Sequence, residues 1–426
     1  MQNEILLRYL RKYRKIERSL STINDVWFDI AIIIPIKNEN PGFRETILSL
    51  LEADSPGLTK IIVIGVVNNS PDDADDIKEN NRQSLLWLKT AAEKTAHSRV
   101  QIAWIDAALQ NPLDPKDSGV GLARKIGMDE ALIRLADPLK GLLVCLDADC
   151  TVNKEYLTAL EEEYLFGNLR AGVARFAHRT EGLNQEHLRA ILSYELYIRL
   201  YAAGALHAGS HYSYLPVGST IVTRGAVYMQ AEGMNKRKAA EDFYFLEKVA
   251  KFTPVKTLYD AVVYPSARIS RRVPFGTGPA VDDILKGERN PDLIYNPEIF
   301  NHLRDWLSVF MAPTLLSNEE YLEAARGIHP GVYDYLSTPV ITRELGNFLA
   351  HSKPGEDLIR RKRSWFDALK TLRMVHTLRD GYMPDIPIDD AITKFAAMIG
   401  ALSPEYSPEK SERLKKQLEW IRILKP

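Results

Sequence analysis

Two aspartates that follow a short apolar run are the residues of this chain best placed to do chemistry. The run Gly141–Leu146 is apolar almost throughout and too short for a typical helix, which is typical of a strand buried on both faces. Asp147 and Asp149 follow it at once, separated by a single alanine. Carboxylates this close repel each other unless a cation lies between them, and a hard divalent cation that also binds phosphate is the usual solution. The pattern predicts a cation site at the end of this strand.

The elements that must position these aspartates alternate between strands and helices. Apolar runs that stop at polar or proline-containing turns predict strands at 29–36, 60–67, 100–105, 141–146 and 171–178. Amphipathic segments predict helices at 42–53, 84–94, 122–136, 153–166 and 185–206. This order predicts an α/β fold with a mostly parallel sheet and right-handed crossovers. In such sheets, ligands bind at the carboxyl ends of the strands, where the two aspartates fall.

Both ends of the chain read as helical. Residues 1–22 form an amphipathic pattern in which Leu6, Leu10 and Tyr13 fall near one face of a strongly basic helix. This helix either contacts an anionic membrane surface peripherally or docks its apolar stripe on its own domain. From about residue 295 onward the pattern is helical again. We expect an N-terminal amphipathic helix at 1–28, a catalytic domain at 29–280 and a helical C-terminal region at 281–426.

The bulk composition excludes several classes of protein. The chain has 426 residues, of which 45% are hydrophobic and 26% charged, and its formal net charge is -1. This balance does not favour a nucleic acid as partner. The two cysteines, Cys145 and Cys150, are expected to be free in a reducing compartment. The sequence shows neither a membrane-spanning run nor a signal peptide, so we expect a cytoplasmic protein, with the inner face of the membrane as the alternative.

Six short motifs carry a resemblance to a known family. They are IPIKNEN at 34–40, VVNNS at 66–70, GLARKIG at 121–127, LDAD at 146–149, VGST at 217–220 and AEDF at 240–243. In this order, over about residues 29–265, they resemble a family 2 glycosyltransferase of the GT-A fold, a Rossmann-like sheet flanked by helices. The resemblance implies transfer of a sugar, with inversion, from a nucleotide-diphosphate donor to an acceptor hydroxyl.

The resemblance also assigns the metal and the nucleotide. Mn²⁺ or Mg²⁺ would neutralise the leaving diphosphate, with Asp149 as direct ligand and Asp147 binding through water or orienting the ribose. Pro35 would shape the first turn, and Glu39 would accept hydrogen bonds from the ribose or base. Asn69 would contact the base. Family members frequently have an aspartate there, so the identity of the base stays open.

Arg124 lies behind a glycine-containing loop, where the family has an arginine that contacts the nucleotide. An arginine is always charged and suits a diphosphate, although a surface position on a helix is the alternative. Gly218 and Ser219 precede a strand and would let the backbone approach the sugar.

The family's catalytic base corresponds to Asp242, because the attacking hydroxyl must lose its proton to a carboxylate within hydrogen-bond reach. Asp242 opens a predicted helix, whose N-terminus favours the ionised form, while neighbouring Glu241 would raise the pKa of Asp242. Glu241 is grouped with the donor-binding residues. A role of Asp242 as a helix cap alone is the alternative.

A basic loop follows the predicted catalytic domain's last strand. Arg268, Arg271 and Arg272 precede the flexible segment Gly276-Thr277-Gly278. These arginines would close over the diphosphate or hold an anionic acceptor, unless the loop simply packs on acidic surface. His211, four residues after His207, is assigned to acceptor contacts in preference to a metal site.

The chain departs from the family at two points. Tyr264-Pro265 stands where many members have a histidine that binds the metal, so the third ligand is undetermined. The Gln-X-X-Arg-Trp motif of processive synthases is absent, so polymerisation coupled to export is not expected. The sequence leaves the acceptor open among a carbohydrate, a small molecule and a lipid-linked compound, and it allows a homo-oligomer.

Two other functions compete with sugar transfer. Asp147-X-Asp149-X-Thr151 also fits the nucleophile motif of a haloacid-dehalogenase-type phosphatase. That nucleophile usually follows the first strand, however, and requires a later pair of aspartates that this chain lacks. A non-catalytic scaffold that binds a nucleotide-sugar is the other alternative, although Asp149 and Asp242 are both intact.

Overall fold

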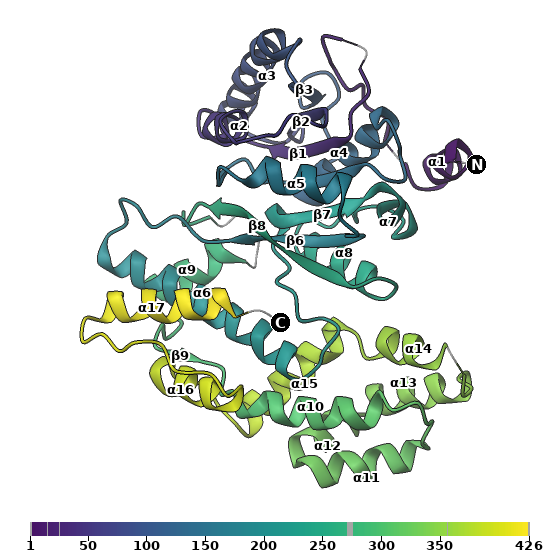
Figure 1. The fold of residues 1–426 in the computed structure, drawn as a ribbon, viewed down its shortest axis with the longest axis vertical. Helices are drawn as coiled ribbons and strands as arrows, with labels where there is room; N and C mark the ends of the chain where they lie inside the picture. The colour runs from purple at the N-terminus through teal and green to yellow at the C-terminus, as the bar shows by residue number, and fades with distance from the viewer. Residues whose placement is uncertain (1, 15, 25, 271–275, 356, 425–426) are drawn as a thin grey trace.

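The centre of the molecule is one mixed sheet flanked by helices (Figure 1). The computed structural model describes residues 2–14, 16–24, 26–270, 276–355 and 357–424. Within these residues the sheet has eight strands in the order β3-β2-β1-β4-β7-β6-β8-β5. Their bounds are β1 Ile30–Ile36, β2 Ile61–Asn68, β3 Val100–Ala107, β4 Leu142–Cys145, β5 Cys150–Val152, β6 Ala171–Phe176, β7 Ile221–Arg224 and β8 Val255–Pro265. The α/β class and the predominance of parallel pairs are as predicted.

Strand direction brings many strand ends to one edge. β3, β2, β1 and β4 are mutually parallel, and β6 is parallel to β8. β7 runs antiparallel to both β4 and β6, so β4 and β6 point the same way. The carboxyl ends of β1, β2, β4, β6 and β8 therefore share one edge, and β7 starts there. Polar residues that follow these strands are brought together by this topology.

Helices cover both faces of the sheet and enclose two apolar cores. Ile33 and Ile64 face one core with Ile126, while Ile32 and Val63 face the other. Successive strand residues are thus buried on opposite faces, which is why these strands read as unbroken apolar runs. The helices of this part are α2 Phe43–Leu51, α3 Asp75–Thr95, α4 Val120–Arg134, α5 Tyr156–Leu165, α6 Gln185–His207, α7 Gly225–Gln230, α8 Glu241–Ala250 and α9 Thr277–Leu285.

The N-terminal helix docks on its own domain. α1 spans Gln2–Tyr13, and Leu6 and Leu10 pack against the first core beside the buried ring of Tyr9. The hydroxyl of Tyr9 donates a hydrogen bond of 2.7 Å to Asp129 on α4. The apolar stripe is therefore used inside the domain, which is the second of the two alternatives for this helix. None of the helices in the described chain is both long and apolar enough to cross a bilayer.

The helix is shorter than the predicted segment 1–28. It ends at Tyr13, and the described residues between it and β1 form no helix; Ser21 pairs with Trp104 and Phe28 with Leu135 in isolated β-bridges. Ile16, Leu20 and Val26 pack against the same core from this extended segment. Packing of these apolar side chains on the domain, rather than helical periodicity, decides the conformation after residue 13.

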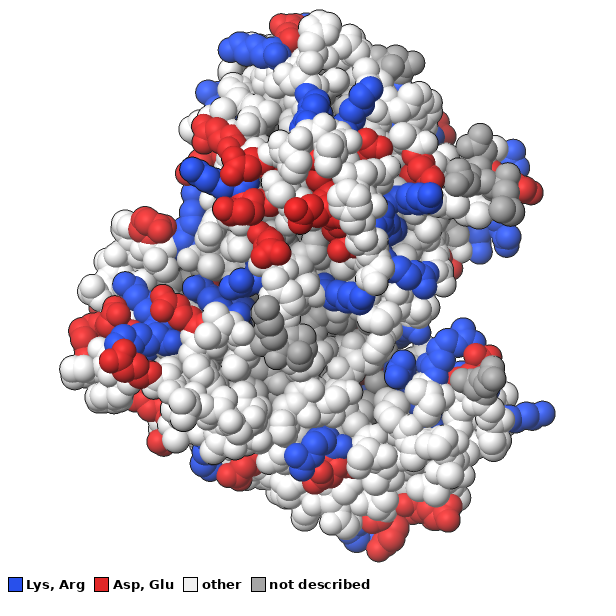
Figure 2. All heavy atoms as spheres, viewed as in Figure 1, with Lys and Arg blue, Asp and Glu red and all other residues white. Residues whose placement is uncertain are grey.

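A helical region follows the sheet and shares α6 with it (Figure 1). Leu192, Leu196 and Leu200 of α6 enter the same core as Trp306 and Leu418. The elements are β9 Leu293–Ile294, α10 Glu298–Phe310, α11 Asn318–Ile328, α12 Pro330–Leu336, α13 Pro339–Ala350, α14 Leu358–Trp365, α15 Ala368–Gly381, β10 Ile386–Pro387, α16 Ile388–Met398 and α17 Lys410–Ile423. The expected helical C-terminal region is present, and the domain boundary near 280 stays a prediction because α6 belongs to both parts. Figure 2 shows Lys and Arg interspersed with Asp and Glu on the surface, in keeping with the small net charge.

Candidate functional site

A cleft of about 940 Å³ opens at the shared edge of the strands. Each of five strands contributes a polar residue just past its carboxyl end: Glu39 after β1, Ser70 after β2, Asp149 after β4, His178 after β6 and Arg268 after β8. The start of β7 adds the backbone of 218–219, and the start of α8 adds 240–242. The cleft thus lies where open α/β sheets bind their ligands.

A buried arginine joins two of the predicted site residues. Arg124, on α4 and only 2% exposed, forms ion pairs with Asp147 and with Glu241. The guanidinium passes beside Gly218, where a Cβ atom would lie 2.4 Å from Nη1 of Arg124. A side chain at position 218 would therefore collide with the arginine. Four residues predicted from separate motifs meet at this point.

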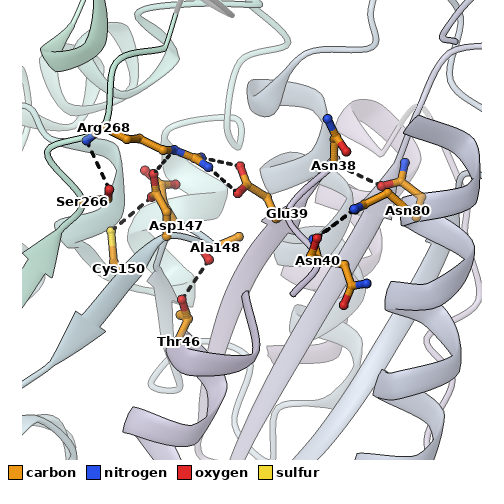
Figure 3. A network of polar contacts seen from close by, with 12 residues as sticks. Asn38, Glu39, Asn40, Thr46, Asn80, Asp147, Ala148, Cys150, Ser266 and Arg268 are labelled. Carbon is orange, nitrogen blue, oxygen red and sulfur yellow. Dashed lines mark hydrogen bonds and ion pairs between the residues drawn. The ribbon is translucent and has the colours of Figure 1, made fainter. Parts of the chain in front are cut away.

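A second arginine, Arg268, pairs with Glu39 (Figure 3) and also with Asp149. Arg268 donates hydrogen bonds of 2.8 and 2.5 Å to the two oxygens of Glu39, and its Nε lies 2.9 Å from Oδ2 of Asp149. The hydroxyl of Thr46 on α2 donates a hydrogen bond of 2.9 Å to the carbonyl of Ala148 and so fixes the turn that carries the two aspartates. Arg268 is thus a cation placed beside the predicted metal ligand.

The aspartates as arranged offer a divalent cation only part of a coordination shell. Carboxylate oxygens are the ligands that Mg²⁺ and Mn²⁺ prefer. Among the described residues, however, no three His, Cys, Asp or Glu side chains gather in a metal-binding arrangement. Arg268 pairs with Asp149, and Arg124 pairs with Asp147. A cation here would need to take Asp149 from Arg268 and to find its other ligands beyond these two aspartates.

The predicted base lies in the cleft at the first turn of α8. Asp242 lines the cavity, and its Oδ1 accepts a hydrogen bond of 2.7 Å from the backbone N–H of Phe243. Burial raises the pKa of Asp242 above its ordinary value, while Arg124 opposes the rise. Ala240, just before the helix, has φ 57°, a left-handed conformation that costs about 1–2 kcal/mol for a residue with a Cβ. Backbone strain of this kind gathers at functional sites.

Two more cleft carboxylates, Glu241 and Asp149, also have a raised pKa. Burial raises the pKa of Glu241 to about 7; Asp242 adds to the rise and Arg124 opposes it. Burial likewise raises the pKa of Asp149, which Asp147 and Glu39 push further and Arg268 lowers. Carboxylates are therefore more numerous here than the arginines that neutralise them.

Other predicted residues lie at different distances from the cavity. Pro35 and Ser219 line it as expected. Asn69 does not: it is 2% exposed, its Nδ2 donates to the carbonyl of Ser70 at 3.1 Å, and its Oδ1 accepts from Asn81 at 3.4 Å. Its neighbours Asn68 and Ser70 line the cavity instead. β2 ends at Asn68, and in the turn that follows the side chain of Asn69 is held by Ser70 and Asn81 and does not line the cavity.

His211 lies away from the cleft, contrary to the assignment to acceptor contacts. It is absent from the cavity wall and faces the backbone of Ala250 and the charge of Arg363, and burial lowers its pKa. After α6 ends, Gly209 with φ 72° turns the chain toward the helical region. That turn, which spacing alone does not reveal, removes His211 from the site. Arg271 and Arg272 lie outside the described residues.

Sequence analysis assigned no role to several polar residues of the cleft, among them His178, Tyr194 and Thr277. His178 is the last residue of the predicted strand 171–178, so its place at the carboxyl end of a strand was a usable signal. Tyr194 reads as part of the apolar face of α6, and Thr277 as part of a flexible glycine segment. Nothing in their local sequence distinguishes these two from ordinary helix and loop residues.

Comparison with protein-family models gives no match, and comparison with curated proteins gives none either. Among solved structures, Staphylococcus aureus TarS 1-349 is similar with a TM-score of 0.36 and 16% identity, over 83% of this chain and 92% of that chain. The mannosyltransferase PcManGT from Pyrobaculum calidifontis, in complex with GDP-Man and Mn²⁺, is similar with a TM-score of 0.35 and 15% identity, over 89% of this chain and 95% of that chain. TM-scores this low do not establish a shared fold or activity.

Proposed function

We propose that this protein is an inverting glycosyltransferase of the family 2 type, which moves a sugar from a nucleotide-diphosphate donor to an acceptor hydroxyl. The observation that carries the proposal is the placement of Asp242, Asp147 and Asp149 on one cleft, with Arg124 and Arg268 among them. A single displacement needs a base for the attacking hydroxyl and positive charge for the departing diphosphate, and both kinds of group are present here.

The donor half of the site is formed by the first strands. Pro35, Glu39, Asn68 and Ser70 line the wall where a nucleoside would lie. Arg268 is about two-fifths exposed, and the partners that hold it are the carboxylates of Glu39 and Asp149. A diphosphate offers the same kind of oxygen pair, so Arg268 can exchange a carboxylate for a phosphate without losing bidentate hydrogen bonding.

The charge balance of the cleft supports a metal cofactor, for which we propose Mn²⁺ or Mg²⁺. Among the described lining residues, seven are acidic and four basic: Glu39, Asp72, Asp73, Asp147, Asp149, Glu241 and Asp242 against Lys37, Arg124, Lys238 and Arg268. A diphosphate entering this wall meets an excess of negative charge. Asp149 and Asp147 would hold the cation, which when bound would neutralise the leaving group.

Asp242 would take the proton of the acceptor hydroxyl. Its raised pKa makes it a stronger base than an ordinary aspartate, provided that the pH keeps it ionised. The hydrogen bond from the Phe243 N–H fixes the carboxylate at the edge of the cleft.

A thermal-shift screen of nucleoside diphosphates and their sugars, each with and without Mn²⁺ or Mg²⁺, tests this function. We expect one nucleotide to raise Tm, more strongly with metal. A matched screen of Asp147→Asn should lose the metal-dependent part. The proposal fails if no nucleotide changes Tm, and hydrolysis of p-nitrophenyl phosphate that depends on Asp147 would favour a phosphatase instead.

A further inference from the structure

His178 is held in a defined orientation at the end of β6. Its Nδ1 lies 2.8 Å from Oε2 of Glu195, and its backbone N–H donates to the same oxygen at 3.1 Å. An ionised carboxylate only accepts hydrogen bonds, so Nδ1 carries a proton. In the neutral ring, Nε2 is therefore the nitrogen with a free lone pair.

Glu195 is a strongly anchored partner for this histidine. It is 1% exposed on α6, and its Oε1 accepts hydrogen bonds of 2.7 Å from Arg199 and 2.8 Å from Arg422. Burial by itself would raise the pKa of Glu195, but the two arginines and His178 hold it well below its ordinary value. Arg422 belongs to α17, so the C-terminal helix helps to fix a side chain in the cleft.

The Nε2 lone pair of His178 lies beside the hydroxyl of Thr277. Nε2 lies 3.3 Å from Oγ1 of Thr277, the first residue of α9. Burial raises the pKa of Tyr194, and Thr277 and Asp242 both act on it, so the phenol lies close to both side chains. A threonine hydroxyl has one proton and two lone pairs, so Thr277 can donate to Nε2 and still accept from a neighbouring hydroxyl. All three side chains line the cleft.

We propose that His178, Tyr194 and Thr277 form the acceptor subsite, and that it receives a neutral polyhydroxy compound, a sugar or polyol, through its hydroxyl groups. This inference rests on the proposed function, since it concerns the acceptor half of the same cleft. The donor half is built by β1, β2 and β4. The three acceptor residues come instead from the end of β6, from α6 and from the start of α9, and Tyr194 lies close to Asp242.

The chemistry of the three side chains decides the class of acceptor. Imidazole, phenol and alcohol groups offer hydrogen bonds of both kinds and no fixed charge, which is what neighbouring hydroxyls of a polyol need. An anionic acceptor would instead come close to the carboxylate of Asp242 and be repelled. When an acceptor binds, one of its hydroxyls replaces Thr277 as the donor to Nε2 of His178, so that an adjacent hydroxyl is presented to Asp242.

The test uses histidine-labelled full-length protein with UDP or GDP bound, whichever raises Tm. Methyl α-D-glucopyranoside and glycerol, titrated as neutral probes, should shift the ¹⁵N resonance of His178 Nε2. His178→Asn keeps an N–H donor for Glu195 but removes the group at the Nε2 position; His178→Gln places an amide oxygen near it. We expect a dissociation constant for the glucoside about fivefold to tenfold higher in the Asn variant, with partial recovery in the Gln variant.

Failure of this inference is distinguishable from failure of the proposed function. If a nucleotide stabilises the protein but neither probe moves the His178 resonance, sugar transfer stands and the acceptor subsite is wrong. Tighter binding of glycerol 3-phosphate than of glycerol at His178 would overturn the neutral acceptor class. If no nucleotide stabilises either variant or the parent, the proposed function falls and the acceptor role falls with it.

Discussion

The cleft carboxylates and Glu195 both pair with arginines, but the ratio of carboxylates to cations differs between the two clusters. Glu195 is one carboxylate shared by Arg199, Arg422 and His178, and its pKa is lowered. In the cleft, Arg124 and Arg268 serve several carboxylates, among which Asp149, Glu241 and Asp242 have a raised pKa. The same residue types thus form one cluster in which cations outnumber the carboxylate and another in which carboxylates outnumber the cations.

This difference in charge ratio predicts different roles for the two clusters. A carboxylate with more cations than it needs is fixed in its ionised form and stabilises the fold. Carboxylates with too few cations lower stability in the free protein, and such perturbed groups in a cleft are held for a ligand. Substitutions in the two clusters should therefore have opposite consequences for stability and activity.

The largest expected effect is on activity in the cleft. Asp242→Asn should lower the rate of the proposed sugar transfer by about 10²–10⁴-fold, because the variant loses the proposed general base. The same change should leave Tm unchanged or higher, since it removes a charge that burial disfavours. Initial rates and thermal melts of both proteins check this. Unaltered turnover would exclude Asp242 as the base.

In the Glu195 cluster the expected effect is on stability. Glu195→Gln leaves Arg199 and Arg422 buried without a counter-charge, which should cost about 3–5 kcal/mol in the free energy of unfolding. Asp149→Asn is the matched change in the cleft and should alter that free energy by less than about 1 kcal/mol. Urea denaturation measures both. Equal losses in the two variants would contradict the contrast drawn between the clusters.

A smaller effect is expected where the chain makes room for Arg124. In Gly218→Ala the new Cβ would lie 2.4 Å from Nη1 of Arg124, so the arginine must move off Asp147 or Glu241. We expect a loss of about 1–3 kcal/mol in stability, together with weaker nucleotide binding. Gly327→Ala is the control, because no atom lies within 4 Å of its added Cβ. If both variants melt alike, the close approach at Gly218 is unimportant.

The smallest effect is a pH dependence that belongs to the cleft. The folded pKa of Glu241 is about 7, above its unfolded value, so the folded state binds a proton first as pH falls. Stability should therefore rise on acidification from pH 8 to 5.5, by about 1–2 kcal/mol more in the parent than in Glu241→Gln. Glu195 has the opposite sign: its contribution is present above its unfolded pKa and is lost only in stronger acid. Urea denaturation of both proteins across this pH range measures the difference. Parallel curves of stability against pH for the parent and the variant would refute the assignment to Glu241.

Much of the sheet could be predicted because its signals are local. The apolar runs at β1, β2 and β4 and the polar turns after them lie within a few residues of each other. Glu39, Arg124, Asp147, Asp149 and Asp242 were placed at element ends, and the structure brings all five to one cleft. Two predicted side chains do not line this cleft: His211 follows the turn at Gly209, and Asn69 is hydrogen-bonded to Ser70 just after β2 ends.

By itself, therefore, the sequence determined the alternation of strands and helices and the excess of carboxylates at strand ends, since both depend on neighbouring residues. Only the tertiary structure decided which cation meets which carboxylate. Arg268 and Glu39 are 229 positions apart, and Arg422 and Glu195 are 227 apart. Such pairs are set by how strands and helices pack, and a side chain's charge carries no information about its distant partner. The division into a cation-poor cleft and a cation-rich support beside it follows from that packing.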